Sequence, residues 1–145
     1  MGGLKLVKRF RKNVREGRMQ RMLSLAAAAS APPLALEVYL EHYKGSFGDK
    51  WMWTPIVLTP PLTAAGIAGF YSESAARRWL PVFGALFALD GIIGIVTHIR
   101  GVQKRPGGFA EPTYNLVMGP PLLAPGSLTM VGAFGVMAAF VRREK

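Results

Sequence analysis

The stretch WLPVFGALFALDGIIGIVTHI, residues 79–99, contains one carboxyl group, that of Asp90, and no basic side chain other than His98 in 21 consecutive positions. A helix of this length is about 31 Å long, which matches the ~30 Å hydrocarbon core of a bilayer. Aromatic Trp79 opens the stretch and basic Arg100 follows it, as is typical of a membrane boundary. We therefore interpret residues 79–99 as a transmembrane helix.

Three further apolar stretches of comparable length occur along the chain. They cover about residues 22–43, 53–71 and 114–141, and the last is long enough to tilt or break. Short polar loops separate the four stretches, so consecutive helices are expected to run antiparallel. The sequence thus predicts an all-α, polytopic membrane protein with a four-helix transmembrane domain over residues 22–145.

Composition narrows the classes of protein that this chain can represent. Half of the 145 residues are hydrophobic, 18 % are charged, and there is no cysteine. The absence of cysteine excludes disulfides, thiolate metal sites, iron–sulfur clusters and cysteine nucleophiles. No phosphate-binding glycine motif or zinc-binding His-Glu-x-x-His motif is present, and the short loops offer little soluble mass. We therefore expect a protein that is not an enzyme.

Residues 1–21 carry eight of the 18 Lys and Arg residues. Apolar side chains alternate with them at near-helical spacing, which predicts a basic amphipathic segment at the cytoplasmic surface of the bilayer. A solvated basic tail is the alternative interpretation. Nucleic acid is not expected as a partner, because the basic cluster leads directly into an apolar stretch.

The distribution of Lys and Arg predicts the orientation of the chain. The N-terminal segment, the second loop and the C-terminus carry 13 of them, whereas the first and third loops carry five. Basic residues accumulate on the cytoplasmic side. We expect a multi-pass protein of the cytoplasmic (inner) membrane with both termini in the cytoplasm.

An internal repeat is the second informative pattern. The tetrapeptides at 42–45 and 98–101 both read His, bulky apolar, basic, Gly. Each precedes a Pro-Pro-Leu element, starting at Pro60 and Pro120, with a glycine six residues later, Gly66 and Gly126. This order is typical of a tandem αα-hairpin repeat, in which two copies of one unit pack together.

Five prolines lie beyond the first turn of the predicted second and fourth helices. Proline lacks the backbone N–H that an α-helix needs and clashes with the preceding turn. We expect the helices to be kinked or interrupted at these positions: Pro60, Pro61, Pro120, Pro121 and Pro125.

Two histidines occupy equivalent ends of the first and third predicted helices. His42 and His98 would both lie at the external surface, where two imidazoles facing each other can ligate a metal, haem b iron in particular. Lys44 and Arg100 would then bind the haem propionates. The alternative is that these residues only terminate their helices, since basic residues and glycine are common at helix C-termini.

Two acidic residues lie inside predicted membrane helices. Ionisable groups at such depth are costly and usually face the protein interior. Glu37 and Asp90 are therefore candidates for intramembrane proton or polar contacts. Hydrogen bonding that only stabilises the fold is the alternative role.

These features predict a small integral subunit that anchors or packs within a larger membrane complex, such as a respiratory or photosynthetic electron-transfer complex. Its partners would be the lipid bilayer and other membrane-protein subunits. Two alternatives remain open at this point. One is an electron-transfer subunit with haem b held by His42 and His98, and the other is a small proton-coupled transporter that uses Glu37 and Asp90.

Overall fold

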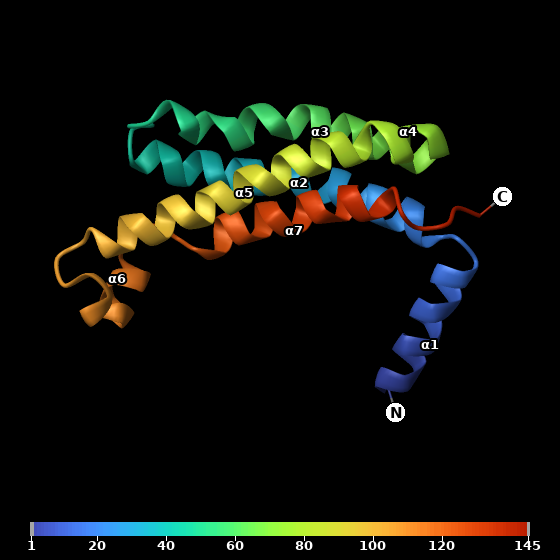
Figure 1. Ribbon diagram of the computed structural model, residues 1–145, viewed down its shortest axis with the longest axis horizontal. Coiled ribbons are helices and arrows are strands. Elements are labelled where there is room, and N and C mark those ends of the chain that lie inside the picture. The colour runs from blue at the N-terminus through green and yellow to red at the C-terminus, as the bar shows by residue number, and fades with distance from the viewer. Residues whose placement is uncertain (1, 145) are drawn as a thin grey trace.

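The computed structural model describes residues 2–144, which are helical with no β-strand among them (Figure 1). The predicted all-α class is confirmed. Short 3-10 turns cover Lys50–Trp53 and Gly108–Ala110. The α-helices, in chain order, are α1 (Gly2–Arg15), α2 (Met19–Lys44), α3 (Thr54–Tyr71), α4 (Glu73–Arg78), α5 (Leu80–Gln103), α6 (Pro112–Val117) and α7 (Leu123–Ala138).

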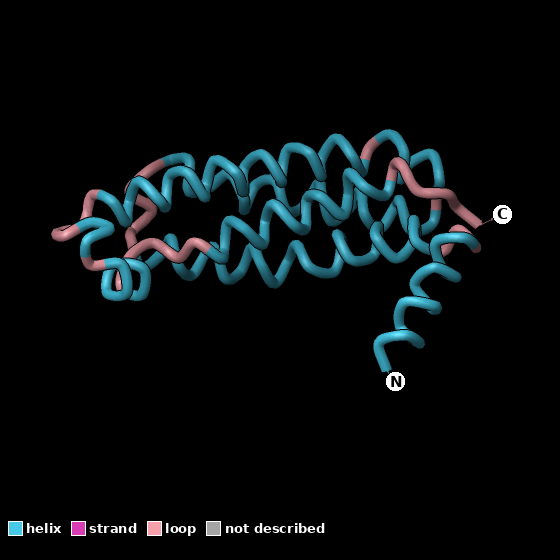
Figure 2. The backbone as a smooth tube through the Cα atoms, turned by 60° about the horizontal axis from the view of Figure 1, so that its bottom comes forward, coloured by secondary structure: helices cyan, strands magenta, loops and turns pink. Residues whose placement is uncertain are grey.

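Four long helices lie side by side and form the body of the molecule (Figures 1 and 2). Helix α2 packs against α3 and α7, and α5 packs against the same two helices. Helices α2 and α5 therefore lie diagonally across the body. The N- and C-terminal segments meet at one end, and the loops before α3 and α7 lie at the other.

Helices occupy the first three predicted spans, and two helical stretches are long and apolar enough to cross a membrane. These stretches are Met19–Lys44 and Glu73–Gln103, the second of which includes α4 and α5. The fourth predicted stretch, 114–141, which is long enough to tilt or break, is broken: α6 ends at Val117 and α7 begins at Leu123. The α-conformation is disfavoured for a residue that precedes proline, which explains the break before Pro120 and Pro121.

The prolines of α3 behave differently from those before α7. Helix α3 continues through Pro60 and Pro61 without interruption. Pro125 is tolerated because it lies in the first turn of α7, where an N–H has no partner inside the helix. Interruption is thus confirmed only at Pro120 and Pro121.

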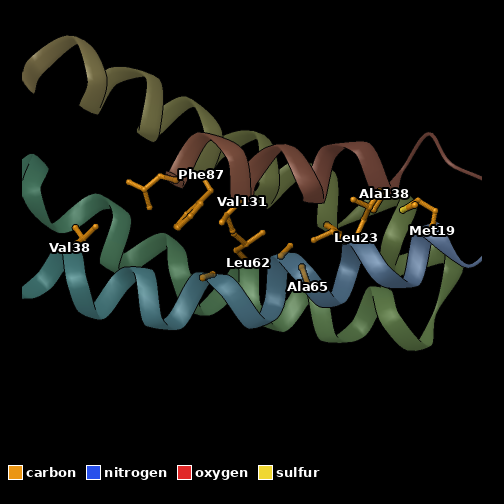
Figure 3. Close-up of a cluster of buried hydrophobic side chains, with 12 residues drawn as sticks. Met19, Leu23, Val38, Leu62, Ala65, Phe87, Val131 and Ala138 are labelled. Atoms are coloured by element: carbon orange, nitrogen blue, oxygen red, sulfur yellow. The ribbon is translucent and has the colours of Figure 1, made fainter. Parts of the chain in front are cut away.

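Small residues bring the helices into close contact at the centre of the body. A methyl group on Gly132 of α7 would collide with the carbonyl oxygen of Gly84 and the amide nitrogen of Ala88 on α5. Larger apolar side chains fill the space between the four helices, among them Leu62 and Phe87 (Figure 3). The two glycines therefore allow the two backbones to touch, and the larger side chains surround this contact.

The two helix pairs share some of their buried positions. Adding 56 to the buried positions Ser24, Ala28 and Ala31 of α2 gives Leu80, Gly84 and Phe87 of α5, which are also buried. Adding 69 to Thr59, Leu62, Gly66 and Gly69 of α3 gives Leu128, Val131, Gly135 and Ala138 of α7, which are again all buried. The same offset of 56 residues relates His42 of α2 to His98 of α5.

The Pro-Pro-Leu elements do not share this correspondence. Pro60 lies in the middle of α3, whereas Pro120 lies in the break before α7. Gly66 contacts α2, but Gly126 has open space where a side chain would extend. The similarity of the two Pro-Pro-Leu segments is therefore not reproduced by their positions in the fold.

Helix α1 leads away from the four-helix body at the end where the termini meet (Figures 1 and 2). The chain turns at Gly17, whose φ of 77° favours glycine, and the backbone N–H of Glu144 donates to the Gly17 carbonyl at 2.9 Å. Arg18 and Arg21 form ion pairs with the Glu144 carboxylate at 3.6 and 3.4 Å. The C-terminal segment thus holds the turn between α1 and α2.

Replacing Gly132 with alanine should lower the free energy of unfolding by about 1–3 kcal/mol, because the added methyl group forces α5 and α7 apart. Gly126→Ala is the matched control in the same helix. Its side chain meets open space, and alanine should stabilise the helix by about 0.5–1 kcal/mol. Thermal unfolding in detergent micelles, followed by circular dichroism, measures both effects. Equal stability of the two variants would contradict the packing argument.

Candidate functional site

The two histidines lie together at the end of the body opposite the termini. His42 comes from the last turn of α2 and His98 from the later part of α5. Their ring centroids are 6.5 Å apart and their planes are inclined by 79°. Because α2 and α5 are diagonal neighbours, the pair bridges the body rather than an ordinary helix–helix contact.

A backbone carbonyl fixes the ring of His42. Its Nδ1 lies 2.9 Å from the carbonyl oxygen of Met52, in the 3-10 turn before α3. The residue three positions further on is Pro55, which has no N–H to offer that carbonyl. The imidazole of His42 therefore supplies a hydrogen-bond donor in place of the N–H that proline lacks at position 55.

His98 makes the same kind of contact in the second helix pair. Its Nδ1 lies 2.6 Å from the carbonyl oxygen of Pro121, in the break before α7. In a continuous helix that carbonyl would accept from the residue four positions on, which is Pro125. Each histidine thus contacts a carbonyl that lies shortly before a proline: Pro55 occupies the 3-10 partner position of Met52, and Pro125 the α-helical partner position of Pro121.

These contacts assign the tautomer of both neutral rings. A carbonyl oxygen can only accept, so Nδ1 of each ring carries the hydrogen and donates it. In a neutral imidazole the other nitrogen, Nε2, then has a free lone pair. When both rings are neutral, His42 and His98 therefore present two Nε2 lone pairs on rings whose orientation is set by the main chain.

The cations expected beside the histidines are arranged differently from each other. Lys44 forms an ion pair with Glu41 one turn earlier in α2. Arg100 is exposed on α5. Lys44 is therefore already neutralised by its own helix, whereas Arg100 projects from the surface.

The two acidic candidates are not brought together. Asp90 is half-buried and its carboxylate accepts a hydrogen bond from the Thr54 hydroxyl at 2.5 Å, which ties α5 to the start of α3. Asp90 is also close enough to His42 to interact with it electrostatically. Glu37 instead lies on an exposed face of α2, contrary to the expectation that it faces the interior.

An aromatic cluster beside the histidines could not be read from the sequence. Phe47 stacks on Trp53 with centroids 4.1 Å apart and lies 6.1 Å from the His42 ring. Tyr39 packs against Phe47 at 5.4 Å. The signal in the sequence was the density of aromatic residues around the first loop, which also fits an interfacial belt.

A buried polar cluster at the opposite end was also missed. Arg143 is only 8 % exposed and donates to the carbonyl oxygens of Gly69 and Phe70 at 2.8 and 2.7 Å, at the C-terminal end of α3. It also donates to Gln20, whose amide donates to the carbonyl of Ala138 at 2.8 Å. Burial lowers the pKa of Arg143, but its ordinary value is so high that the guanidinium stays charged.

Comparison with protein-family models, curated proteins and solved structures gives no match to the chain.

The proline explanation predicts an energetic coupling between His98 and Pro125. His98→Ala should lower the free energy of unfolding by about 1–3 kcal/mol, because the Pro121 carbonyl loses its donor. In a Pro125→Ala background the new backbone N–H can bond that carbonyl, so the loss should shrink by about 0.5–1.5 kcal/mol. A double-mutant cycle measured by thermal unfolding in micelles checks this. Strictly additive effects would show that Pro125 is not the reason why the Pro121 carbonyl lacks a backbone donor.

Proposed function

We propose that this protein is a small multi-pass membrane protein that packs as a non-catalytic subunit within a larger membrane assembly. In this proposal α2, α3, α5 and the α6–α7 segment each cross the bilayer, and both termini lie in the cytoplasm. The observation that carries the proposal is an apolar surface on the body between two ends rich in cations.

The outer surface of α5 illustrates this apolar belt. Large hydrophobic side chains remain exposed along it, at positions where a soluble helix would present polar residues. These residues are Val82, Leu86, Leu89, Ile92, Ile93 and Val96. Exposed apolar residues also occur on α2, α3 and α7, including Leu36, Val57 and Met130. Lipid or a partner subunit would cover such surfaces.

Antiparallel packing gathers the cations at the two ends. Arg18, Arg77 and Arg142 belong to segments at the end that carries the termini, together with the basic helix α1. Lys50 and Arg100 belong to the opposite end. The excess of cations at the first end supports a cytoplasmic location for it.

Helix α1 supports the same placement. Its apolar side chains Leu4, Val7 and Phe10 are all more than half exposed. At 100° per residue they share one face with Leu6 and Val14, while most of its Lys and Arg residues lie opposite. A helix of this kind that projects from the cytoplasmic end would lie along the leaflet, with its cations among anionic headgroups.

The outer face of α7 supports packing against another subunit. Gly126 leaves open space on this face, next to Leu123, which is 86 % exposed, and Met130. In a bilayer, small residues allow the close helix contacts that drive association, because burying apolar surface there gains little. Helix α7 is also short, about 24 Å for 16 residues, so neighbouring protein would shield the broken backbone before it.

The orientation is tested by single cysteines, since the chain has none of its own. Cysteines at Gly48 and Lys104 should react with a membrane-impermeant maleimide added outside intact cells, because both loops lie at the external end. A cysteine at Ser74 in α4 should react only after the cells are permeabilised. The opposite pattern would contradict the proposed topology.

Packing through α7 is tested by adding volume to its outer face. Gly126→Leu should shift the protein in native gels of mildly solubilised membranes from a large assembly to a monomer-sized species, because the bulk separates the helices. Ala64→Leu on the exposed face of α3 is the matched control and should leave the assembly intact. A monomer-sized band for the unmodified protein would refute the subunit role, and equal effects of both variants would refute the choice of α7.

A further inference from the structure

We propose that His42 and His98 bind one monovalent copper ion between their Nε2 atoms, in a linear two-coordinate site. This inference goes beyond the proposed subunit role and does not depend on it. It begins from the tautomer: both Nδ1 atoms face backbone carbonyls, so both Nε2 lone pairs are free to act as ligands.

The spacing of the rings fits a shared metal ion. Two metal–nitrogen bonds of about 2 Å, with about 1 Å from each Nε2 to its ring centre, place the centroids about 6 Å apart in a linear arrangement. The observed separation is 6.5 Å, so the rings need to approach by only a small movement. An inclination of 79° is compatible with this geometry, because a linear site requires only that the line through both Nε2 atoms lies in each ring plane and sets no angle between the planes.

The number of ligands selects the ion. Among residues 2–144 no group of three or more His, Asp or Glu side chains is placed to hold a metal. Zinc and divalent copper require about four ligands, whereas monovalent copper is stable with two ligands in a line. Two neutral imidazoles alone therefore favour the monovalent ion.

The surroundings place a carboxyl group near the pair and hold the ligands in place. Asp90 interacts electrostatically with His42, whereas Glu41 is already ion-paired with Lys44. Hydrogen bonds from Nδ1 to Met52 and Pro121 orient the rings in the way that partners of ligating histidines usually do. The main chain thus organises the site before the ion arrives.

Silver(I) is the probe, because it prefers the same two-coordinate geometry and does not change oxidation state in air. The full-length protein in detergent micelles should bind one equivalent of silver(I) by titration calorimetry. Copper(I) supplied from a chromogenic chelator should be withdrawn from it with the same stoichiometry. X-ray absorption of the copper(I) complex should show two nitrogen ligands at about 1.9–2 Å.

Asparagine variants separate metal binding from folding. The Asn side-chain amide can replace the Nδ1 donor to the carbonyl but offers no Nε2 atom. His42→Asn and His98→Asn should each weaken silver(I) binding at least about 100-fold, while the unfolding temperature stays close to that of the unmodified protein. A control substitution at the surface, Tyr43→Phe, should leave both silver(I) binding and the unfolding temperature unchanged.

Several results would overturn the proposal. The first is that the unmodified protein does not bind silver(I). The second is that both asparagine variants bind silver(I) as tightly as the unmodified protein, and the third is that the absorption spectrum shows three or more ligands. Haem b bound through both histidines, with no affinity for copper(I), would overturn it in favour of a tetrapyrrole site. None of these results alters the cysteine-labelling pattern, so failure of the copper site and failure of the membrane topology are distinguishable.

Discussion

Backbone carbonyls that lack a helical N–H donor dominate the polar chemistry of this structure. Prolines and helix ends create them, and in an apolar environment each unsatisfied group costs several kcal/mol. Side chains from distant segments of the chain donate hydrogen bonds to these carbonyls. His42 and His98 serve the starts of α3 and α7, Arg143 serves the end of α3, and Gln20 serves the end of α7. The same bonds that satisfy these carbonyls also connect helices.

Much of the helical architecture could be predicted because it depends on local patterns. Apolar stretches of sufficient length marked three of the helices to within a few residues, and the paired prolines at Pro120 and Pro121 ended a helix as their chemistry requires. Pro60 and Pro61 did not, because packing of α3 against α2 and α5 offsets the loss of hydrogen bonds. Sequence alone does not reveal which proline pair is supported by neighbours.

The histidine pair could be predicted in part, because both histidines lie in the repeated tetrapeptide. The repeated tetrapeptide placed both rings at equivalent helix ends, and the structure brings them together. The carbonyl groups that bind the two rings could not be predicted, because the conformations of the loops, and not the residue types of Met52 and Pro121, bring these carbonyls to the histidines. Gln20 and Arg143 were missed for a similar reason: they are 123 positions apart, and each resembles an ordinary residue of a basic segment.

The contacts of the C-terminal segment have a consequence for how the two ends of the fold depend on each other. Arg143 and Glu144 close the gap between α2, α3 and the turn at Gly17, and 123 positions separate Arg143 from its partner Gln20. The direction of α1 relative to the body is therefore set only once the segment after α7 has docked. Loss of these contacts would free α1 to change direction while α2, α3, α5 and α7 stay packed against one another.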